Sequence, residues 1–224
     1  MSLNNPFILK RFNKLSGFYA SNVSLLAAVF VTAIMTLMAT LLIGKPAYAQ
    51  TVVNTQTKDT AGDLRYTVQN NTLVLSNGKS FKATGQAEFS YLFWDVYDSR
   101  LFNMKGKFDS KSDWHEQGPV VLEIHYKRDI KAKDLIDSTV EQWQHLKVSD
   151  ADYAQYVTWL SETWPNLKEG DKLALLMYSD HSVFFYNNEF LSKQDNPEFG
   201  KTFLDIWLSV DTSEPKLRKQ LLSL

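Results

Sequence analysis

The feature that most constrains the fold is a change of hydrophobic period in the middle of the chain. In residues 120–126, Val, Leu, Ile and Tyr occupy every second position, which is the period of a β-strand. Apolar residues then recur every three or four positions, as on one face of an α-helix; they are Leu135, Ile136, Thr139, Val140, Trp143 and Leu146. Both kinds of element must therefore share one core.

The same two periods divide the rest of the chain. Strands are predicted in residues 64–68, 72–75, from Phe81 onward, 87–102 (as two strands or one bent strand), 120–126, 173–178 and 183–186. Helices are predicted in residues 135–146, from an N-cap at Ser149 to Trp164, after Asn196-Pro197, and from Pro215. Because turns such as Asn77-Gly78 and Asn187-Asn188 point to hairpins, we expect an α+β fold with an antiparallel sheet and helices on one face.

The helical periods also predict which side chains face the sheet. On the helix that begins after Ser149 they are Tyr153, Tyr156, Val157, Leu160 and Trp164, and on the helix after Pro197 they are Phe199, Phe203, Ile206, Trp207 and Val210. We expect Trp143 and Trp207 to be buried against the sheet.

The first 49 residues have the features of a secretory signal. Three basic residues, Lys10, Arg11 and Lys14, precede an uncharged apolar run at residues 25–43, and small residues at Ala47 and Ala49 suit a signal peptidase. Cleavage after Ala49 would leave a polar linker, 50–63, and a domain, 64–224, in the periplasm. The alternative is an uncleaved inner-membrane anchor facing the periplasm, because 19 helical residues can span a bilayer.

Charge and cysteine content exclude several kinds of partner. Removing the leader takes away four basic residues and no acidic ones, so the net charge falls from −1 to −5. An acidic domain without a basic stripe is a poor nucleic-acid binder. The absence of cysteine excludes disulfides and thiolate metal sites, so the domain must rely on its core, to which 13% aromatic residues contribute.

Familiar catalytic and cofactor motifs are absent from the sequence. There is no nucleophile elbow, phosphate loop, dinucleotide fingerprint or zinc-protease motif, and no pair of histidines is spaced to bind a metal. The run Ser179-Asp180-His181-Ser182 is too short for its members to converge as a catalytic triad. We therefore assign no catalytic residue, metal or cofactor.

A set of polar-tipped side chains marks a candidate ligand site between sheet and helices. They lie at predicted strand ends or on an inner helix face: Tyr97, Tyr126, Arg128, Trp143, Tyr186 and Asn187. Large aromatic side chains with a few polar groups are typical of sites for small apolar ligands. Plain core packing is the alternative explanation.

Several segments, in this order, resemble the bacterial chalcone isomerase-like proteins, which are exported domains of largely unknown role. The resemblance covers about residues 80–222. It rests on residues 93–102, on 126–130 with Trp143, on Trp164-Pro165, Gly170-Asp171 and 185–187, and on 203–208 with Thr212, Pro215, Leu217-Arg218 and Leu221-Leu222.

The resemblance implies an open-faced β-sandwich of the chalcone isomerase type, with a large antiparallel sheet and helices layered on one side. In the plant enzymes a cleft between the layers binds a flavonoid, and an arginine steadies the phenolate-type oxygen during ring closure. Related non-catalytic members bind fatty acids in the same cleft, with an arginine and a tyrosine at the carboxylate.

The catalytic residues of the plant enzymes do not carry over. Ala87, shortly after Gly85, stands where the resemblance places the arginine, and Tyr97 stands near the catalytic threonine. On the helix, Ile136 and Trp143 fall near the tyrosine and asparagine of the enzymes. No arginine occurs between Arg65 and Arg100. The cation that stabilises an oxyanion is therefore missing.

We therefore expect an exported, non-catalytic domain that holds a small apolar ligand such as a fatty acid. Two alternatives remain: an isomerase or lyase with a rearranged site, and a structural or partner-binding domain without a ligand. We expect no cofactor and no nucleic acid, and membrane contact only through an uncleaved N-terminal segment. The ligand and any protein partner are not identified by the sequence.

Overall fold

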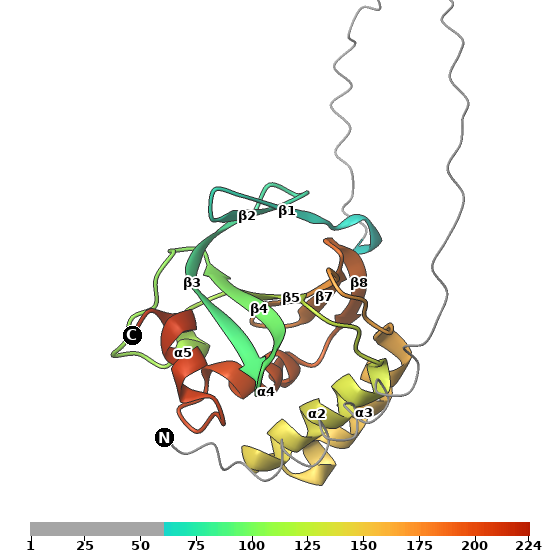
Figure 1. The fold of residues 1–224 in the computed structure, drawn as a ribbon. Coiled ribbons are helices and arrows are strands. Elements are labelled where there is room, and N and C mark those ends of the chain that lie inside the picture. Colours follow the sequence, from blue (N-terminus) through green and yellow to red (C-terminus); the bar gives the residue numbers. More distant parts are fainter. Residues whose placement is uncertain (1–60) are drawn as a thin grey trace, which may run out of the picture. The chain divides into compact units, whose positions relative to one another are not determined.

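An eight-stranded antiparallel sheet, with strands in the order β1 to β8, forms the centre of the structure (Figure 1). The computed structural model describes residues 61–224, so the predicted signal segment, its cleavage site and nearly all of the predicted linker lie outside the described residues. The strands are Tyr66–Gln69 (β1), Thr72–Leu75 (β2), Ser80–Tyr91 (β3), Trp94–Asn103 (β4), Val120–Tyr126 (β5), Lys172–Met177 (β6), Ser182–Tyr186 (β7) and Glu189–Gln194 (β8).

The helices come in two pairs, one between β5 and β6 and one after β8. The first pair is Ala132–His145 (α2) and Asp150–Thr163 (α3), and the second is Pro197–Leu208 (α4) and Pro215–Leu222 (α5); short 3-10 turns are Ala61–Asp63 (η1) and Trp114–Glu116 (η2). This element order confirms the predicted α+β class and the open-faced arrangement.

The sheet curls until its first strand meets its last. Tyr66 donates its backbone N–H to the Asn188 carbonyl at 3.0 Å, and Phe190 donates to the Leu64 carbonyl at 2.9 Å. A bridge between Arg65 and Glu189 lies between these two bonds. Figure 1 shows β1 and β2 arching round toward β8, with helices α2 to α5 on the outside of the curl.

Local sequence explains how the helices and tight turns form. Ser149 accepts a bond from the Asp152 N–H at 3.2 Å and caps α3, and Asn196 caps α4 through the Glu198 N–H at 3.0 Å. Asn187 and Asn188 have φ values of 50° and 76°, a left-handed conformation that asparagine tolerates, and they form the turn between β7 and β8.

Glycine permits one close contact between helix and sheet. A Cβ atom on Gly85 of β3 would lie 2.1 Å from the Gln220 carbonyl oxygen, so only glycine lets the end of α5 approach the strand. The neighbouring Thr84 hydroxyl donates to the Leu221 carbonyl at 3.1 Å and fixes the same contact.

Two separate apolar cores lie on the two sides of the sheet. The convex, helix-facing core includes Leu101, Leu122, Leu175, Phe184, Trp143, Leu160, Phe199, Phe203 and Leu221. The concave core, inside the curl, consists of Tyr66, Leu73, Leu75, Phe81, Phe102, Val121, Ala174, Leu176, Val183 and Phe185. The sheet therefore buries apolar side chains on both of its sides.

This second core corrects an interpretation made from the sequence. The alternation in residues 120–126 predicts that Glu123 and His125 lie on a polar strand face, but this face points into the curl, and Glu123 is only 2% exposed. The interpretation was wrong because the closure of the sheet by β8 is a long-range event. No strand was predicted in residues 189–194, where β8 forms.

The predicted helix faces agree with the structure except at one end of α4. Trp143 is fully buried, and Phe199, Phe203 and Ile206 are buried as expected. Trp207 is only partly buried, and Val210 is 76% exposed because α4 already ends at Leu208. The prediction that Val210 faces the core was therefore wrong.

Every described strand and helix, with both cores, lies within Asp59–Leu224, which clusters as one compact unit. We therefore expect a chain that begins at Gln50 to fold without the residues before it. Among residues 61–224, no helix combines the length and the apolar character needed to cross a bilayer.

Candidate ligand site

Two tyrosines from adjacent strands meet on the helix-facing side of the sheet. Tyr97 of β4 pairs directly with Tyr126 of β5, and their ring centroids are 6.1 Å apart at an angle of 64°. On the other side of Tyr97, the ring of Phe89 from β3 stacks at 5.1 Å. Three neighbouring strands thus place three aromatic rings in one row.

Helix α4 reaches this row through Trp207. The Trp207 Nε1–H group donates to the Tyr97 hydroxyl oxygen at 3.0 Å. This bond uses Tyr97 as an acceptor and leaves its own proton available. Within residues 61–224, the structure gives no acceptor for the hydroxyl proton of either Tyr97 or Tyr126. Two phenolic O–H donors therefore lie on adjacent strands without an acceptor.

Both hydroxyls remain protonated at neutral pH. Burial raises the pKa of Tyr126 well above its ordinary value, and the neighbouring Tyr97 adds to the rise. The pKa of Tyr97 is also raised, chiefly by burial, with the Trp207 hydrogen bond acting in the opposite direction. The pair can thus donate hydrogen bonds but does not carry charge.

The two nearest arginine candidates do not supply a cation to this pair. Arg128 lies with its guanidinium 4.6 Å above the ring centroid of Trp94. Arg100 points into the opposite, concave side of the sheet, where its Nε donates to Glu123 at 3.1 Å. The charged group that acts on Tyr97 is Glu214, an acid that raises the pKa of Tyr97 further.

Apart from Tyr97, the positions that match the catalytic residues of the plant enzymes are buried and bring no free polar group to the site. Ala87 is 4% exposed, and its carbonyl accepts a bond from the Ser99 hydroxyl at 3.0 Å. Ile136 and Trp143 on α2 are likewise buried. No proton donor or cation from these three side chains enters the site.

Trp143 belongs to the contact between helices. Its Nε1–H donates to the Thr202 carbonyl on α4 at 3.0 Å, and its ring lies 5.7 Å from Tyr153 and 6.0 Å from Tyr156 on α3. Because its polar atom already has a partner, the structure favours packing over ligand binding for Trp143.

Tyr186 and Asn187 hold a turn together. Tyr186 donates to one oxygen of Asp171 at 2.8 Å, and Asn187 donates to the other at 2.9 Å. The Asn187 side chain also accepts the Lys172 N–H at 2.8 Å. The hydrogen bond to Asp171 is the main reason that the pKa of Tyr186 is raised. The polar groups of both predicted residues are therefore used within this turn.

Sequence reasoning missed one further donor on the helix-facing side. The Nε1 atom of Trp164 is buried and has no hydrogen-bond partner within the described part of the chain. Its ring packs between Phe184 and Phe203, at 5.5 and 5.9 Å. The sequence placed Trp164 on an inner helix face, but no local signal reveals whether an indole N–H finds a partner.

Comparisons with known proteins agree with this architecture. The family model described as chalcone isomerase-like matches residues 51–223. An uncharacterized protein of Haemophilus influenzae is 25% identical over 138 residues, which is 62% of this chain and 66% of the relative, just under two thirds of its length.

A solved structure shares the fold. The crystal structure of a fatty-acid binding protein of Arabidopsis thaliana superposes with a TM-score of 0.51 and 10% sequence identity, and the match covers 67% of this chain and 95% of the plant chain. Since the family model spans most of the sequence and the curled sheet with its outer helices is present, the chain belongs to the chalcone isomerase-like family.

Proposed function

We propose that this protein is an exported, non-catalytic domain that binds a small apolar ligand with an oxygen-bearing head group, such as a fatty acid. The observation that carries the proposal is the Tyr97–Tyr126 pair, whose two hydroxyl protons have no acceptor in the described structure. Each hydroxyl can donate a hydrogen bond to a ligand oxygen, and such a bond contributes about 0.5–1.5 kcal/mol.

The surroundings of the pair suit an apolar tail. Phe89, Ile206 and Trp207 belong to the same helix-facing core as the two tyrosines. The likeness to a plant fatty-acid binding protein supports a ligand of this class. Because the donors are neutral, the head group can be a carboxylic acid, a carboxylate or an ester carbonyl.

The same geometry argues against ring-closing catalysis. An enzyme accelerates a reaction only through groups that bind the transition state better than the ground state. Growing negative charge on an oxygen calls for a cation or preorganised donors. Ala87 supplies neither, and Arg100 is engaged with Glu123 on the other side of the sheet.

The direct experiment is an organic extract of protein purified from a native host, analysed by mass spectrometry. The expected result is a bound lipid or fatty acid in the wild-type extract and a strongly reduced amount in the Tyr97→Phe/Tyr126→Phe variant. The Tyr178→Phe variant, which alters a partly buried tyrosine packed against the concave core, serves as a control. A clean extract from well-folded wild-type protein would contradict the proposal.

Export is tested separately by intact mass. Protein from the native host should begin at Gln50, as expected from the Ala-x-Ala ending at Ala47 and Ala49. Recovery of the chain with Met1 in the membrane fraction would instead support a membrane anchor.

A further inference from the structure

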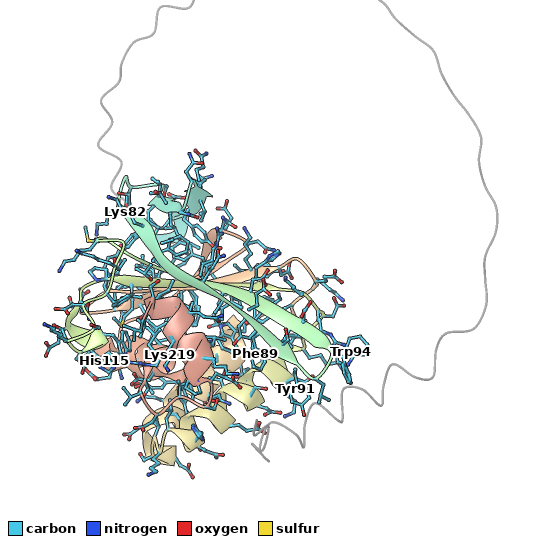
Figure 2. The ribbon with its side chains drawn as sticks, turned by 60° about the vertical axis from the view of Figure 1, so that its left-hand side comes forward. Lys82, Phe89, Tyr91, Trp94, His115 and Lys219 are labelled. Carbon is cyan, nitrogen blue, oxygen red and sulfur yellow. The ribbon has the colours of Figure 1, made fainter. Side chains whose placement is uncertain are left out.

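The hairpin between β3 and β4 ends in three consecutive apolar side chains that face away from both cores. Leu92 is 64% exposed, Phe93 is 96% exposed and Trp94 is 55% exposed. Figure 2 shows Tyr91 and Trp94 at the far end of this hairpin, with Phe89 set back toward the helices. Single exposed apolar residues are ordinary, but a run of three at a protruding tip calls for an explanation.

The backbone of the turn adds an independent observation. Tyr91 pairs with Trp94, so Leu92 and Phe93 form a two-residue loop. Leu92 has a φ of 56°, whereas Phe93 is not among the residues with positive φ. Two-residue turns with positive φ only at the first position favour glycine there. A leucine in this place costs conformational energy, and such costs persist mainly where function requires the side chain.

The shape of the tip favours a bilayer over a protein as its partner. A stable protein interface buries about 800 Å² on each side with complementary surfaces. A two-residue turn with three side chains is too small for that, and it protrudes. A bilayer interface accepts a protruding apolar wedge without a matching pocket, and Trp and Tyr rings favour this zone.

The charges around the tip are compatible with a lipid surface. Arg128 lies over the Trp94 ring, where its guanidinium can reach phosphate groups while the ring enters the apolar layer. Lys127 pairs with Asp98 at 2.8 Å, which raises the pKa of Lys127, and the nearby carboxylates of Glu88 and Asp95 raise this pKa further. Because cations and carboxylates nearly balance, the apolar side chains should dominate membrane binding, with little dependence on salt.

We propose that the tip formed by Leu92, Phe93 and Trp94 inserts into the interface of a lipid bilayer. This contact is independent of the N-terminal segment and of the Tyr97–Tyr126 pair. It would hold the domain at a membrane surface even after the leader has been removed.

The test measures co-sedimentation of the chain from Gln50 with vesicles of phosphatidylcholine and with vesicles of phosphatidylethanolamine and phosphatidylglycerol. Wild-type protein should bind both, and high salt should change binding less than twofold. The Leu92→Gly/Phe93→Ser variant should bind at least roughly tenfold more weakly, because it removes two apolar side chains. Leu92→Gly also relieves the positive φ, so the variant should fold at least as well at this turn.

A matched control removes apolar surface elsewhere. Val210 is 76% exposed and lies outside the hairpin, so Val210→Thr should leave vesicle binding unchanged. No sedimentation of folded wild-type protein with either vesicle, or equal binding by the tip variant and wild type, would overturn the proposal. So would a loss of binding in the Val210→Thr control that matches the loss in the tip variant.

A label provides a second readout. Because the chain has no cysteine, Phe93→Cys and Val210→Cys each create a single attachment point for a polarity-sensitive dye. The dye at position 93 should show a large gain in emission with vesicles, and the dye at position 210 should not. Equal responses at the two positions would contradict insertion of the tip, whatever the outcome of the ligand extraction.

Discussion

The two sides of the sheet differ in whether the hydroxyl protons of their tyrosines have acceptors. On the concave side, Tyr66 donates to Glu123 at 2.7 Å, and Arg100 donates to the same carboxylate at 3.1 Å. On the helix-facing side, Tyr97 and Tyr126 have no acceptor for their protons in the described structure. The Tyr66 hydroxyl therefore has its acceptor within the concave side, whereas the Tyr97 and Tyr126 hydroxyls retain hydrogen-bonding capacity for a ligand.

This contrast separates structural polar groups from candidate functional ones. A buried carboxylate that accepts bonds from both a guanidinium and a phenol has its hydrogen-bonding needs met, and removing one partner is costly. Buried donors without partners, such as Trp164 Nε1 on the helix-facing side, are uncommon in native proteins and call for a reason.

The first prediction concerns the core that supports the helix-facing side. Trp143→Ala should lower the free energy of unfolding by about 3–5 kcal/mol, because it leaves a large cavity among the helices. Trp94→Ala, at an exposed tryptophan, should change it by less than about 1 kcal/mol. Urea melts measure both. A loss below about 1 kcal/mol for Trp143→Ala would show that the helices do not depend on this ring.

The second prediction breaks the concave network. Glu123→Leu should cost roughly 1–3 kcal/mol, since it leaves the Arg100 guanidinium and the Tyr66 hydroxyl without their acceptor. The double variant Arg100→Met/Glu123→Leu should recover much of that loss, because no uncompensated charge remains. A double variant less stable than Glu123→Leu would contradict this account, because it would show that Arg100 stabilises the fold even without its acceptor.

The third prediction concerns alkaline pH. Burial raises the folded-state pKa of Tyr66, Tyr97 and Tyr126 above the ordinary 10.0. Their contribution to stability is thus fully present below pH 10 and is lost as pH rises through the folded pKa values. Each tyrosine that stays protonated should lower stability by about 1.4 kcal/mol per pH unit above 10.

Tyrosinate absorbance and urea melts at the same pH values measure this effect. Absorbance from Tyr66 and Tyr126 should appear only when the protein unfolds. Early ionisation of these tyrosines in folded protein would show that one side of the sheet is more open than the structure indicates.

Much of the fold follows from local sequence signals. The alternation in residues 120–126 gives β5 with the same bounds, and Ser149 caps α3 as expected. Strand β8 could not be predicted, because Glu189–Gln194 has no strong alternation and gains its place by pairing with β7 and meeting Arg65. The concave core was missed for the same reason.

The candidate site was predictable only in part. Tyr97 and Tyr126 lie together because their strands pair in register, and both were chosen from the sequence. Which polar atoms find partners depends on contacts across the fold, such as Asp171 with Tyr186 or Thr202 with Trp143. Sequence patterns do not contain that information.

The fourth prediction is the smallest effect, the absence of ring closure. With a 2'-hydroxychalcone, the purified protein should give no flavanone above the spontaneous rate, because no cation faces the tyrosine pair. Loss of chalcone absorbance and chiral analysis of the product measure this. Stereoselective product that disappears in the Arg128→Ala variant would establish a rearranged active site instead.

The most direct measurement compares the two sides of the sheet in one assay. Titration of the chain from Gln50 with a fluorescent fatty acid gives the Kd, and urea melts give the stability of the same samples. Tyr97→Phe/Tyr126→Phe should raise the Kd about tenfold, as expected for the loss of two hydrogen bonds to the ligand. Stability should fall by about 1 kcal/mol, because the Trp207 Nε1–H loses its acceptor. Tyr66→Phe should lower stability by about 1–2 kcal/mol and leave the Kd unchanged. Binding that survives loss of the Tyr97–Tyr126 hydroxyls, or that depends on Tyr66, would contradict the account.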